Sequence, residues 1–472
     1  MDARMDEAFS AWGRFTNDTE KEESVPAILR YDPSVGLELE FAGSPPGFDC
    51  RAEEAVPPLT YFGVLVNGTY VTVVNCYFRS SKSGAGARGL PTTFFADRAL
   101  FGAHVPNLDT LMVSQYSIEL SSLSNWMCVS PASLLPAEDE DGNQGVDIEF
   151  RRPAAIRVEL PEKSCDVGLS HRWTSLHDRS SVSVAWRAGI SIWAQDTLWL
   201  KNVMEFAWRC QNLMSLLAGH ELHVLAVSLQ EPTKHGEDER RQSLQLVYKQ
   251  IGKNDAQDVH PGMMVLPYRD IRDQFPEIVR RWFVRSEQAA LATDLLFTSD
   301  LLTSPAVHVR FLAATQAAEA YQRASGDGFY MDPQEYEASI LPGLRSAIPS
   351  YIDGDHRQSL KNRLKYGNEH SLRKQLSTLL DRVPQNVRSW IANDASKFVD
   401  RVVNTRNYYT HYDMKGKARA YEGEHALVAA ERVRILVIAN VLQDLGIGEK
   451  SLLDALKRSQ DFQHWVSQEL PM

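Results

Sequence analysis

The sequence lacks the paired cysteines that bind zinc or form a disulfide framework. Its five cysteines are scattered through the first half, without a Cys-x-x-Cys pair or a Cys/His cluster at zinc spacing. They are Cys50, Cys76, Cys128, Cys165 and Cys210. This pattern predicts reduced and mostly buried thiols, no metal site and no cofactor.

Long apolar runs and an excess of positive charge are also missing. No stretch approaches the roughly 20 apolar residues of a membrane helix, and residues 1–23 are polar and acidic without the apolar core of a signal peptide. We therefore expect a cytoplasmic protein that makes no contact with membranes. The net charge of -11 excludes a protein that coats nucleic acid indiscriminately.

The first half of the chain has the pattern of a β-rich domain. A chain of 472 residues is too long for one compact core. β-branched and aromatic residues alternate through this half, and Asn67-Gly68 is a strong hairpin signal. Residues 198–218 have the pattern of one long helix, and the acidic stretch 136–145 that of an exposed loop. We expect residues 1–267 to form a sandwich or barrel with one long helix.

From residue 268 onward the apolar period becomes helical, which makes the whole chain α+β. Residues 268–472 are predicted to form an all-α bundle. One predicted helix spans residues 386–410. Another contains residues 433–442, which are apolar around nearly the whole circumference. Such a helix is buried on most sides, either within its own bundle or against a second copy of the chain.

Residues 405–411 contain the side chains that are candidates for a catalytic site. The residues before them show the three-and-four spacing of a buried helix face, and Arg406 continues that apolar stripe. An arginine in such a place needs an anion or a partner. If the helix persists, Asn407 and His411 share a face, with Arg406 roughly 100° around the axis from Asn407. The three side chains would then be placed to converge on one phosphate.

The order of these residues is more informative than their spacing. Arg followed by His within six residues recurs in the chain, but only Arg406 is followed directly by Asn. A helix end with ordinary surface residues is the alternative, because the helix dipole favours histidine there. The stricter pattern Arg-Asn-x-x-x-His, on a helix in an all-helical region, resembles the signature of the HEPN superfamily of ribonucleases.

Further landmarks narrow this resemblance to the ApeA-like HEPN proteins. Three stretches look like successive features of their helical domain: FLAATQAAEAY (residues 311–321), LKYGNEHSL (residues 364–372) and residues 406–411. The first half is similar to the N-terminal domain that accompanies them, in its Asn67-Gly68 hairpin, FGAH (residues 101–104) and LSNW (residues 123–126). The resemblance implies a metal-independent endoribonuclease of anti-phage defence that works as a homodimer through its helical half. Arg406 and His411 match the catalytic pair, and Asn407 matches the polar residue beside the arginine.

The chemistry of RNA cleavage suits these side chains. RNA carries its own nucleophile, the 2′-OH, so the protein has only to move protons and to stabilise charge on the phosphate. Imidazole, with an ordinary pKa of about 6.5, suits proton transfer. Arg406 suits the developing phosphate charge, and Asn407 can orient either partner. Glu319, on an earlier predicted helix, is either an orienting residue of this site or an ordinary residue at the edge of the core.

A basic run precedes the motif. Between residues 357 and 374 the only acidic residue is Glu369. The basic residues are Arg357, Lys361, Arg363, Lys365, Arg373 and Lys374. The run is either a solvated helix face or a track for the RNA backbone.

The first half is expected to control the nuclease by recognising a partner such as a phage-derived protein. Two other functions remain open. One is a non-catalytic scaffold with the HEPN fold, or a sensor that binds nucleotides or RNA. The other is a carbohydrate-binding β domain fused to an unrelated helical module, which predicts an exposed tryptophan groove in residues 25–251. The presence of Arg406, Asn407 and His411 together favours the enzyme.

Overall fold

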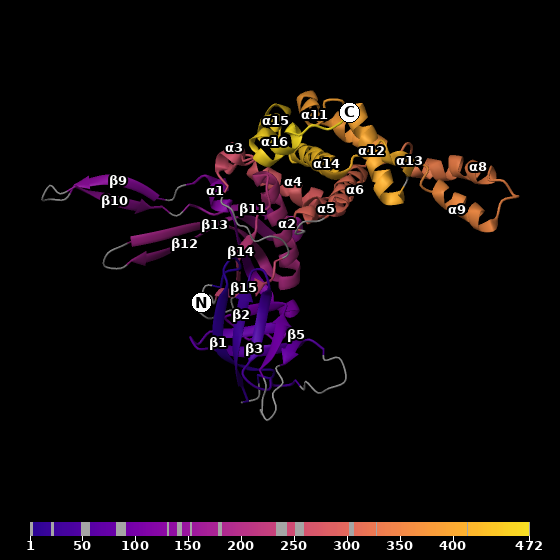
Figure 1. Ribbon diagram of the computed structural model, residues 1–472. Coiled ribbons are helices and arrows are strands. Elements are labelled where there is room, and N and C mark those ends of the chain that lie inside the picture. The colour runs from indigo at the N-terminus through magenta and orange to yellow at the C-terminus, as the bar shows by residue number, and fades with distance from the viewer. Residues whose placement is uncertain are drawn as a thin grey trace. The chain divides into compact units, whose positions relative to one another are not determined.

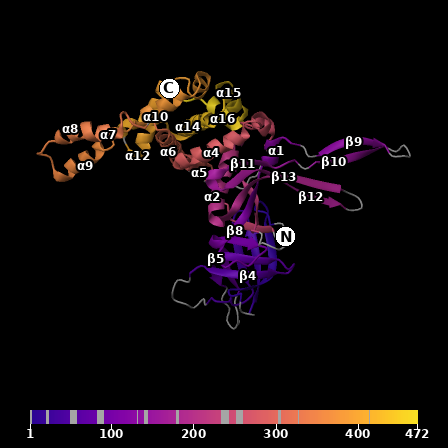
Figure 2. The same cartoon turned by 180° about the vertical axis from the view of Figure 1, so that it is seen from behind.

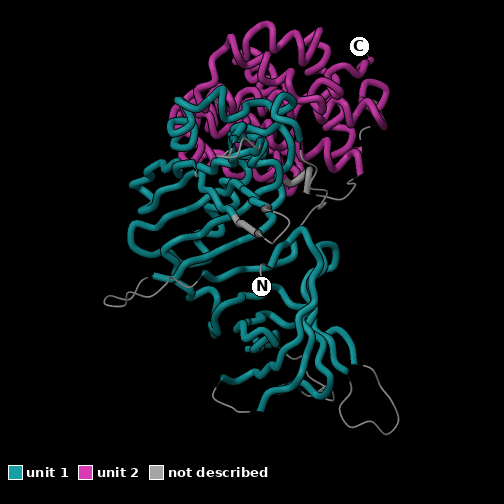
Figure 3. The backbone as a smooth tube through the Cα atoms, turned by 90° about the vertical axis from the view of Figure 1, so that its left-hand side faces the viewer, with its two compact units in different colours: residues 1–280 teal, residues 281–472 magenta. Residues whose placement is uncertain are grey.

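The computed structural model divides the chain into two compact units, Met1–Arg280 and Arg281–Met472 (Figure 3). It describes residues 3–19, 23–48, 57–81, 91–129, 132–138, 144–151, 153–177, 182–232, 243–250, 259–301, 306–326, 328–412 and 414–471. Cys50 lies outside these residues, and of the other four cysteines three are buried and Cys128 is exposed.

The first unit contains a closed barrel of six strands. These are β1 (Phe9–Thr16), β2 (Val25–Asp32), β3 (Gly36–Phe41), β4 (Leu59–Leu65), β5 (Tyr70–Ser81) and β6 (Thr92–Ala96). They pair in the order β5-β4-β1-β2-β3-β6, and β6 returns to β5. The buried rings of Phe15, Phe41, Tyr61 and Phe94 pack against one another in its core. Gly63 is needed there, because a Cβ would lie 2.4 Å from the Phe15 ring. Of the two predicted architectures, the barrel is the correct one.

The same sheet continues beyond the barrel through β5, which also pairs with β7. The remaining strands follow in the order β7 (Arg98–Phe101), β15 (Ser243–Tyr248), β14 (Val224–Gln230), β8 (Met112–Leu120), β13 (Val182–Trp199), β12 (Cys165–His177) and β11 (Ile156–Leu160). Short α1 (Leu123–Met127) and α3 (Tyr268–Ile271) complete the unit, and Tyr268 packs on Trp126.

The long helix α2 (Leu200–Ala218) packs on β8 and β13, as the sequence predicted. Its end at Gly219, with φ +82°, is the left-handed cap that glycine favours. The predicted start is wrong by two residues, because Leu198 and Trp199 still pair with β8 as the end of β13.

The predicted acidic loop is in part a hairpin. Residues 136–138 end β9 (Ala132–Glu138) and residues 144–145 begin β10 (Gln144–Phe150), which pairs with β9 as a separate two-stranded sheet. Residues 139–143 lie outside the described residues. The prediction failed because most side chains of both strands are exposed, so the strands lack the apolar alternation that marks a half-buried sheet.

The second unit is helical. Its chain contains α4 (Phe275–Gln288, which starts before the division), α5 (Ala290–Leu301), α6 (Val307–Ala324), α7 (Pro333–Glu335), a π-helical turn (Tyr336–Ile340), α8 (Leu341–Ser346), α9 (Gly354–Leu364), α10 (Leu372–Arg382), α11 (Gln385–Ile391), α12 (Ala395–His411), α13 (Met414–Lys417), α14 (Gly423–Asp444), α15 (Glu449–Arg458) and α16 (Gln460–Ser467). Within the described part of the chain, no helix is both long and apolar enough to span a bilayer.

Helix α14 is the centre of this bundle. Helices α6, α10, α15 and α16 pack around it (Figures 1 and 2), and its apolar residues are almost completely buried. The two polar residues among residues 433–442 have partners inside the bundle, although the Oδ1 atom of Asn440 has no hydrogen bond among the described residues. Asn440 donates to the carbonyl oxygens of Leu379 and Leu436, and Arg434 is paired with Glu431. Of the two alternatives for residues 433–442, burial within its own bundle is therefore the observed one, and this helix is no evidence for a dimer.

The end of α14 ties the surrounding helices together. The Asp444 carboxylate lies 2.6 Å from Arg285 of α4 and 2.8 Å from Arg382 of α10, and it also accepts a hydrogen bond from Tyr321 of α6. Burial is the main cause that raises the pKa of the Tyr321 phenol. These contacts hold α6 in a defined position against α10 and α14.

The single helix predicted for residues 386–410 is wrong, because α11 and α12 are separate. Ala392 has an extended backbone, with φ −141° and ψ 104°. Asp394 then caps α12, its side chain accepting a hydrogen bond at 3.0 Å from the backbone N–H of Lys397. The apolar spacing continues across the break, which is why periodicity alone did not detect it.

Candidate active site

Residues 405–411 lie in the last two turns of α12. The buried side chains of Phe398, Val399 and Val402 fix this helix in the bundle. The helix continues through His411 and ends at Tyr412, which has φ +54° and donates its backbone N–H to the Tyr408 carbonyl at 2.8 Å. The predicted continuity through the motif is confirmed, so Asn407 and His411 lie one turn apart on one face.

Thr405 sets the rotation of α12. It is completely buried, and its hydroxyl donates to the Arg401 carbonyl at 2.7 Å. The same hydroxyl accepts a 2.7 Å hydrogen bond from the backbone N–H of Tyr421, just before α14. Because Thr405 directly precedes Arg406, these two bonds fix where the guanidinium side chain starts. In the sequence, the only signal for this role is a threonine at a position of the apolar face.

Tyr409 attaches the same turn to α6. Its ring packs on Phe311 at 5.7 Å between centroids and on the exposed His308 at 6.1 Å. Burial raises the pKa of its phenol from the ordinary value. Tyr409 thus packs against α6, whereas His411, two residues later, is exposed on roughly the opposite side of α12.

The Arg406 guanidinium is paired with a carboxylate on another helix. Its Nη2 lies 3.5 Å from Oε1 of Glu319 on α6, with the two side chains 31% and 18% exposed. This Glu319 oxygen is buried and has no hydrogen bond in the described structure. The expectation that an arginine on the apolar stripe needs a partner is therefore met. Glu319 is therefore the partner of Arg406, and its role as an orienting residue of the site stays a prediction.

Asn407 is half-buried and His411 is exposed. Within the described residues, no hydrogen bond or ion pair joins Arg406, Asn407 and His411 to one another. Five residues along an α-helix place Arg406 and His411 roughly 140° apart around the axis. The described structure therefore records no direct contact between the guanidinium and the imidazole, and their convergence on one phosphate stays a prediction.

The structure separates the six basic residues into two groups. Arg357, Lys361, Arg363 and Lys365 lie on α9 or at its C-terminal end, and Arg373 and Lys374 lie in the first turn of α10. Two of the six already have protein partners. Arg357 donates to the Ser350 carbonyl, and Arg373 is paired with Asp400 of α12.

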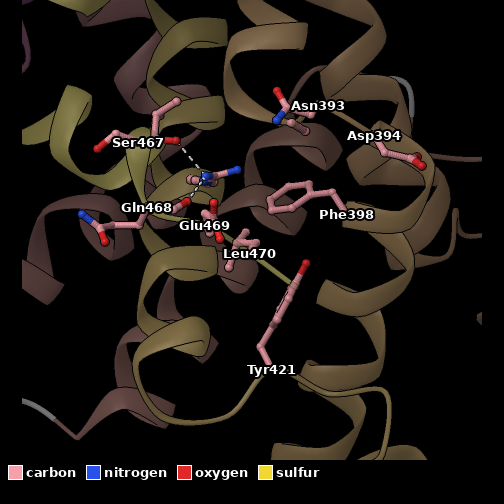
Figure 4. A pocket seen from close by; sticks show the side chains of 11 residues that line it. Asn393, Asp394, Phe398, Tyr421, Ser467, Gln468, Glu469 and Leu470 are labelled. Atoms are coloured by element: carbon pink, nitrogen blue, oxygen red, sulfur yellow. Dashed lines mark hydrogen bonds between the residues drawn. The ribbon is translucent and has the colours of Figure 1, made fainter. Parts of the chain in front are cut away.

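A cavity of about 300 Å³ lies at the other end of α12 (Figure 4). Phe398, Tyr421 and the buried Arg432 are among its lining residues. Burial lowers the pKa of Arg432. Its guanidinium donates to carbonyl oxygens at the ends of two helices, namely those of Ile391 on α11 and of Trp465, Val466 and Gln468 on and after α16. Sequence reasoning missed this residue, although a charge among the apolar residues of α14 was a visible signal.

The first unit also contains a cavity, of about 560 Å³, at one side of the barrel. Phe9, Arg30, Tyr31 and Arg79 are among its described lining residues, and tryptophan is not. The exposed tryptophans Trp12, Trp173 and Trp199 lie on the separate strands β1, β12 and β13. The described structure therefore gives no support to a tryptophan-lined carbohydrate groove. Nor do any three His, Cys, Asp or Glu side chains of the described residues gather as metal ligands would.

Two models of known protein families match the chain, one in each half. The family model described as ApeA N-terminal domain 1 matches residues 11–282, and the model described as Apea-like HEPN matches residues 312–451. No curated protein and no solved structure matches the chain. HEPN domains are in general ribonuclease domains, which indicates a nuclease-type role in defence. With both models matching in this order, the chain belongs to the ApeA-like HEPN family.

Proposed function

We propose that the protein is a metal-independent endoribonuclease of anti-phage defence that cuts cellular RNA in the cytoplasm. The observation that carries this proposal is the arrangement on α12, inside the range matched by the HEPN model. A half-buried Arg406 is held by Glu319, and an exposed His411 ends the same helix. The pair supplies a fixed positive charge and an accessible imidazole, which are what phosphate-ester cleavage by an internal nucleophile requires.

In the proposed reaction His411 takes the proton from a ribose 2′-OH. The 2′-oxygen then bonds to the adjacent phosphorus, and the bond from phosphorus to the 5′-oxygen breaks. The leaving 5′-oxygen takes up a proton from solvent, which leaves a 2′,3′-cyclic phosphate on one fragment and a 5′-hydroxyl on the other. Arg406 stabilises the charge on the phosphate oxygens, and Asn407 orients the phosphate or the imidazole.

We propose that the working unit is a homodimer formed through the helical half. Arg406 and His411 point to different sides of α12, so one chain offers only half of the constellation at any one point. A second copy placed against this end of α12 would complete it. Because α14 is buried in its own bundle, the pairing surface has to lie on other helices. Light scattering of the intact protein at micromolar concentration is the direct measurement, and a monomer with full activity would contradict the composite site.

We propose that the first unit regulates the nuclease by binding a partner, such as a phage-derived protein. A partner can activate the enzyme only if it binds the competent state more tightly than the resting state. In cells that carry the intact gene, RNA should stay whole before infection and be cut afterwards. The same cells with His411→Ala should show no cutting at either time.

The central experiment is incubation of the purified protein with total RNA in EDTA, followed by analysis of the fragment ends. We expect cleavage with 2′,3′-cyclic phosphate ends or their hydrolysis products. Cleavage that needs added metal would overturn the mechanism. Binding of RNA or nucleotides without any cleavage would instead support the non-catalytic scaffold or sensor.

A further inference from the structure

Residues 329–370, here called the arm, leave the helical bundle and return to it at one point. Asn368 closes the base, and it is almost completely buried. Its side chain accepts from the Met331 N–H at 3.0 Å and donates to the Met331 carbonyl at 2.8 Å, and its own carbonyl accepts from the Tyr330 N–H. Beyond this closure the arm consists of α7, the π-helical turn, α8 and α9. The arm is therefore a helical insertion that is closed at its base by the hydrogen bonds of Asn368.

Exposed aromatic side chains are concentrated on the arm. Among the described residues of the helical unit, five large aromatic side chains are exposed, and four of them belong to the arm: Phe329, Tyr330, Tyr351 and Tyr366. The fifth is Tyr412, which directly follows His411. Tyr351 is 88% exposed, Tyr412 77% and Tyr366 65%. Because the other aromatic rings of this unit are at least partly covered, this distribution marks a surface for a flat, stackable ligand.

The part of this surface around the end of α9 is locally positive, although the arm as a whole has six acidic residues against five basic ones. Residues 356–368 contain no acidic residue, and α9 ends in the sequence Lys361-Asn362-Arg363-Leu364-Lys365. Arg363 and Lys365 are exposed, and neither forms an ion pair or side-chain hydrogen bond in the described structure. Cations next to exposed rings are the combination that binds a phosphate backbone whose bases stack on the protein.

The ligand that fits is single-stranded RNA rather than a duplex or a protein. In a duplex the bases stack on each other and offer no free face, whereas an unpaired base can stack on an exposed tyrosine. A protein partner would need a contiguous apolar face. On α9 the two leucines, Leu360 and Leu364, are only half-exposed, and the large exposed aliphatic residues of the arm are Ile340 and Leu344, each 41% exposed. These two residues make a small patch and not an apolar face of the size a protein partner needs.

The arm also leads to the candidate active site. Its last residue, His370, is followed at once by α10, whose Arg373 is paired with Asp400 on α12. Asn407 and His411 follow Asp400 by seven and eleven residues, which places all three on one face of the helix. Figures 1 and 2 agree that α8 and α9 extend from the side of the bundle on which α12 lies.

We propose that the arm and Tyr412 form the surface on which this nuclease holds a single-stranded stretch of RNA. Arg363 and Lys365 contact phosphates, and Tyr351, Tyr366 and Tyr412 stack on unpaired bases. The strand runs from the arm toward the face of α12 that carries Asn407 and His411. The inference rests on the proposed function for the chemistry that follows binding, while the binding itself can be measured without cleavage.

The test uses the full-length protein with His411→Ala, so that RNA is bound and not cut. The probe is a 20-nucleotide fluorescein-labelled RNA without self-complementarity, free or annealed to its complement, and the readout is fluorescence anisotropy. We expect the single strand to bind at least about tenfold more tightly than the duplex, and Tyr366→Ala to weaken single-strand binding about tenfold. Arg363→Glu with Lys365→Glu should weaken binding and reduce the dependence on salt concentration, since two phosphate contacts are lost.

The matched control is Lys450→Glu with Lys457→Glu, two exposed positions on α15 that change the net charge equally. This control should bind like its parent, and circular dichroism melts of all variants should coincide. Equal affinity for duplex and single strand, no binding at all, or arm variants that bind like the control would each overturn the proposal. If arm-dependent binding is found but the protein with His411 intact cuts no RNA, the nuclease assignment fails and the binding surface stands.

Discussion

Arg406 of α12 lies 3.5 Å from Glu319 of α6, and this contact joins two of the stretches that the family resemblance singled out separately. Glu319 is only 18% exposed, so its carboxylate has few alternatives to the guanidinium. The pair explains how an arginine is kept partly exposed on an otherwise apolar stripe. It also implies that the position of Arg406 depends on α6.

Glu319→Gln should lower the rate of RNA cleavage about tenfold at saturating RNA, because an amide no longer holds the guanidinium in place. The affinity for RNA should change little, since the arm is untouched. Initial rates against RNA concentration separate the two effects. Glu424→Gln, at an exposed position of α14, is the control. An unchanged rate in Glu319→Gln would show that Glu319 is only a residue at the edge of the core.

His411→Ala should reduce cleavage by about a hundredfold or more, because the proton acceptor is lost. The side chain is exposed at the end of α12, so the free energy of unfolding should change by less than about 0.5 kcal/mol. His425→Ala, at an exposed position in the first turns of α14, should leave both quantities unchanged. RNA fragment analysis and chemical denaturation measure the two effects. Full activity of His411→Ala would remove the catalytic assignment.

Tyr412→Gly should make the protein more stable and less able to bind RNA. Tyr412 has φ +54°, a conformation that costs a residue with a Cβ about 1 kcal/mol and glycine almost nothing. The substitution also removes the exposed ring beside His411. Denaturant titration should show a gain of up to about 1 kcal/mol, and anisotropy should show weaker binding of single-stranded RNA. A loss of stability would mean that the ring contact with Tyr408, at 5.9 Å, outweighs the backbone strain.

Arg432→Met should destabilise the protein by about 3 kcal/mol or more, because it leaves several buried carbonyl groups without a donor. Arg432→Lys should recover only part of this loss, since an ammonium group cannot reach the ends of α11 and α16 in the same fork geometry. Arg419→Met, at an exposed position, is the control. Thermal unfolding provides the measurement. If Arg432→Met unfolds at the same temperature as Arg419→Met, the hydrogen bonds from Arg432 to the ends of α11 and α16 do not stabilise the fold.

The sequence was sufficient to predict those elements whose conformation depends on residues close together in the chain. The Asn67-Gly68 turn does join β4 to β5, with Gly68 at φ +80°. The helical period of residues 395–411 is α12, and Gly219 ends α2. The N-cap Asp394 is an equally local signal, which the unbroken apolar spacing on both sides of it masks. Each of these features depends on φ preferences or on hydrogen bonds within a few residues.

Local pattern was enough to assign residues 405–411 to a helix end with an arginine, an amide and a histidine at set angles. Tertiary structure alone decided the remaining features. The barrel closes through the pairing of β5 with β6, the partner of Arg406 is a glutamate on another helix, and α14 is buried by its own bundle. These contacts join residues far apart in the chain, and local periodicity contains no information about which buried faces meet.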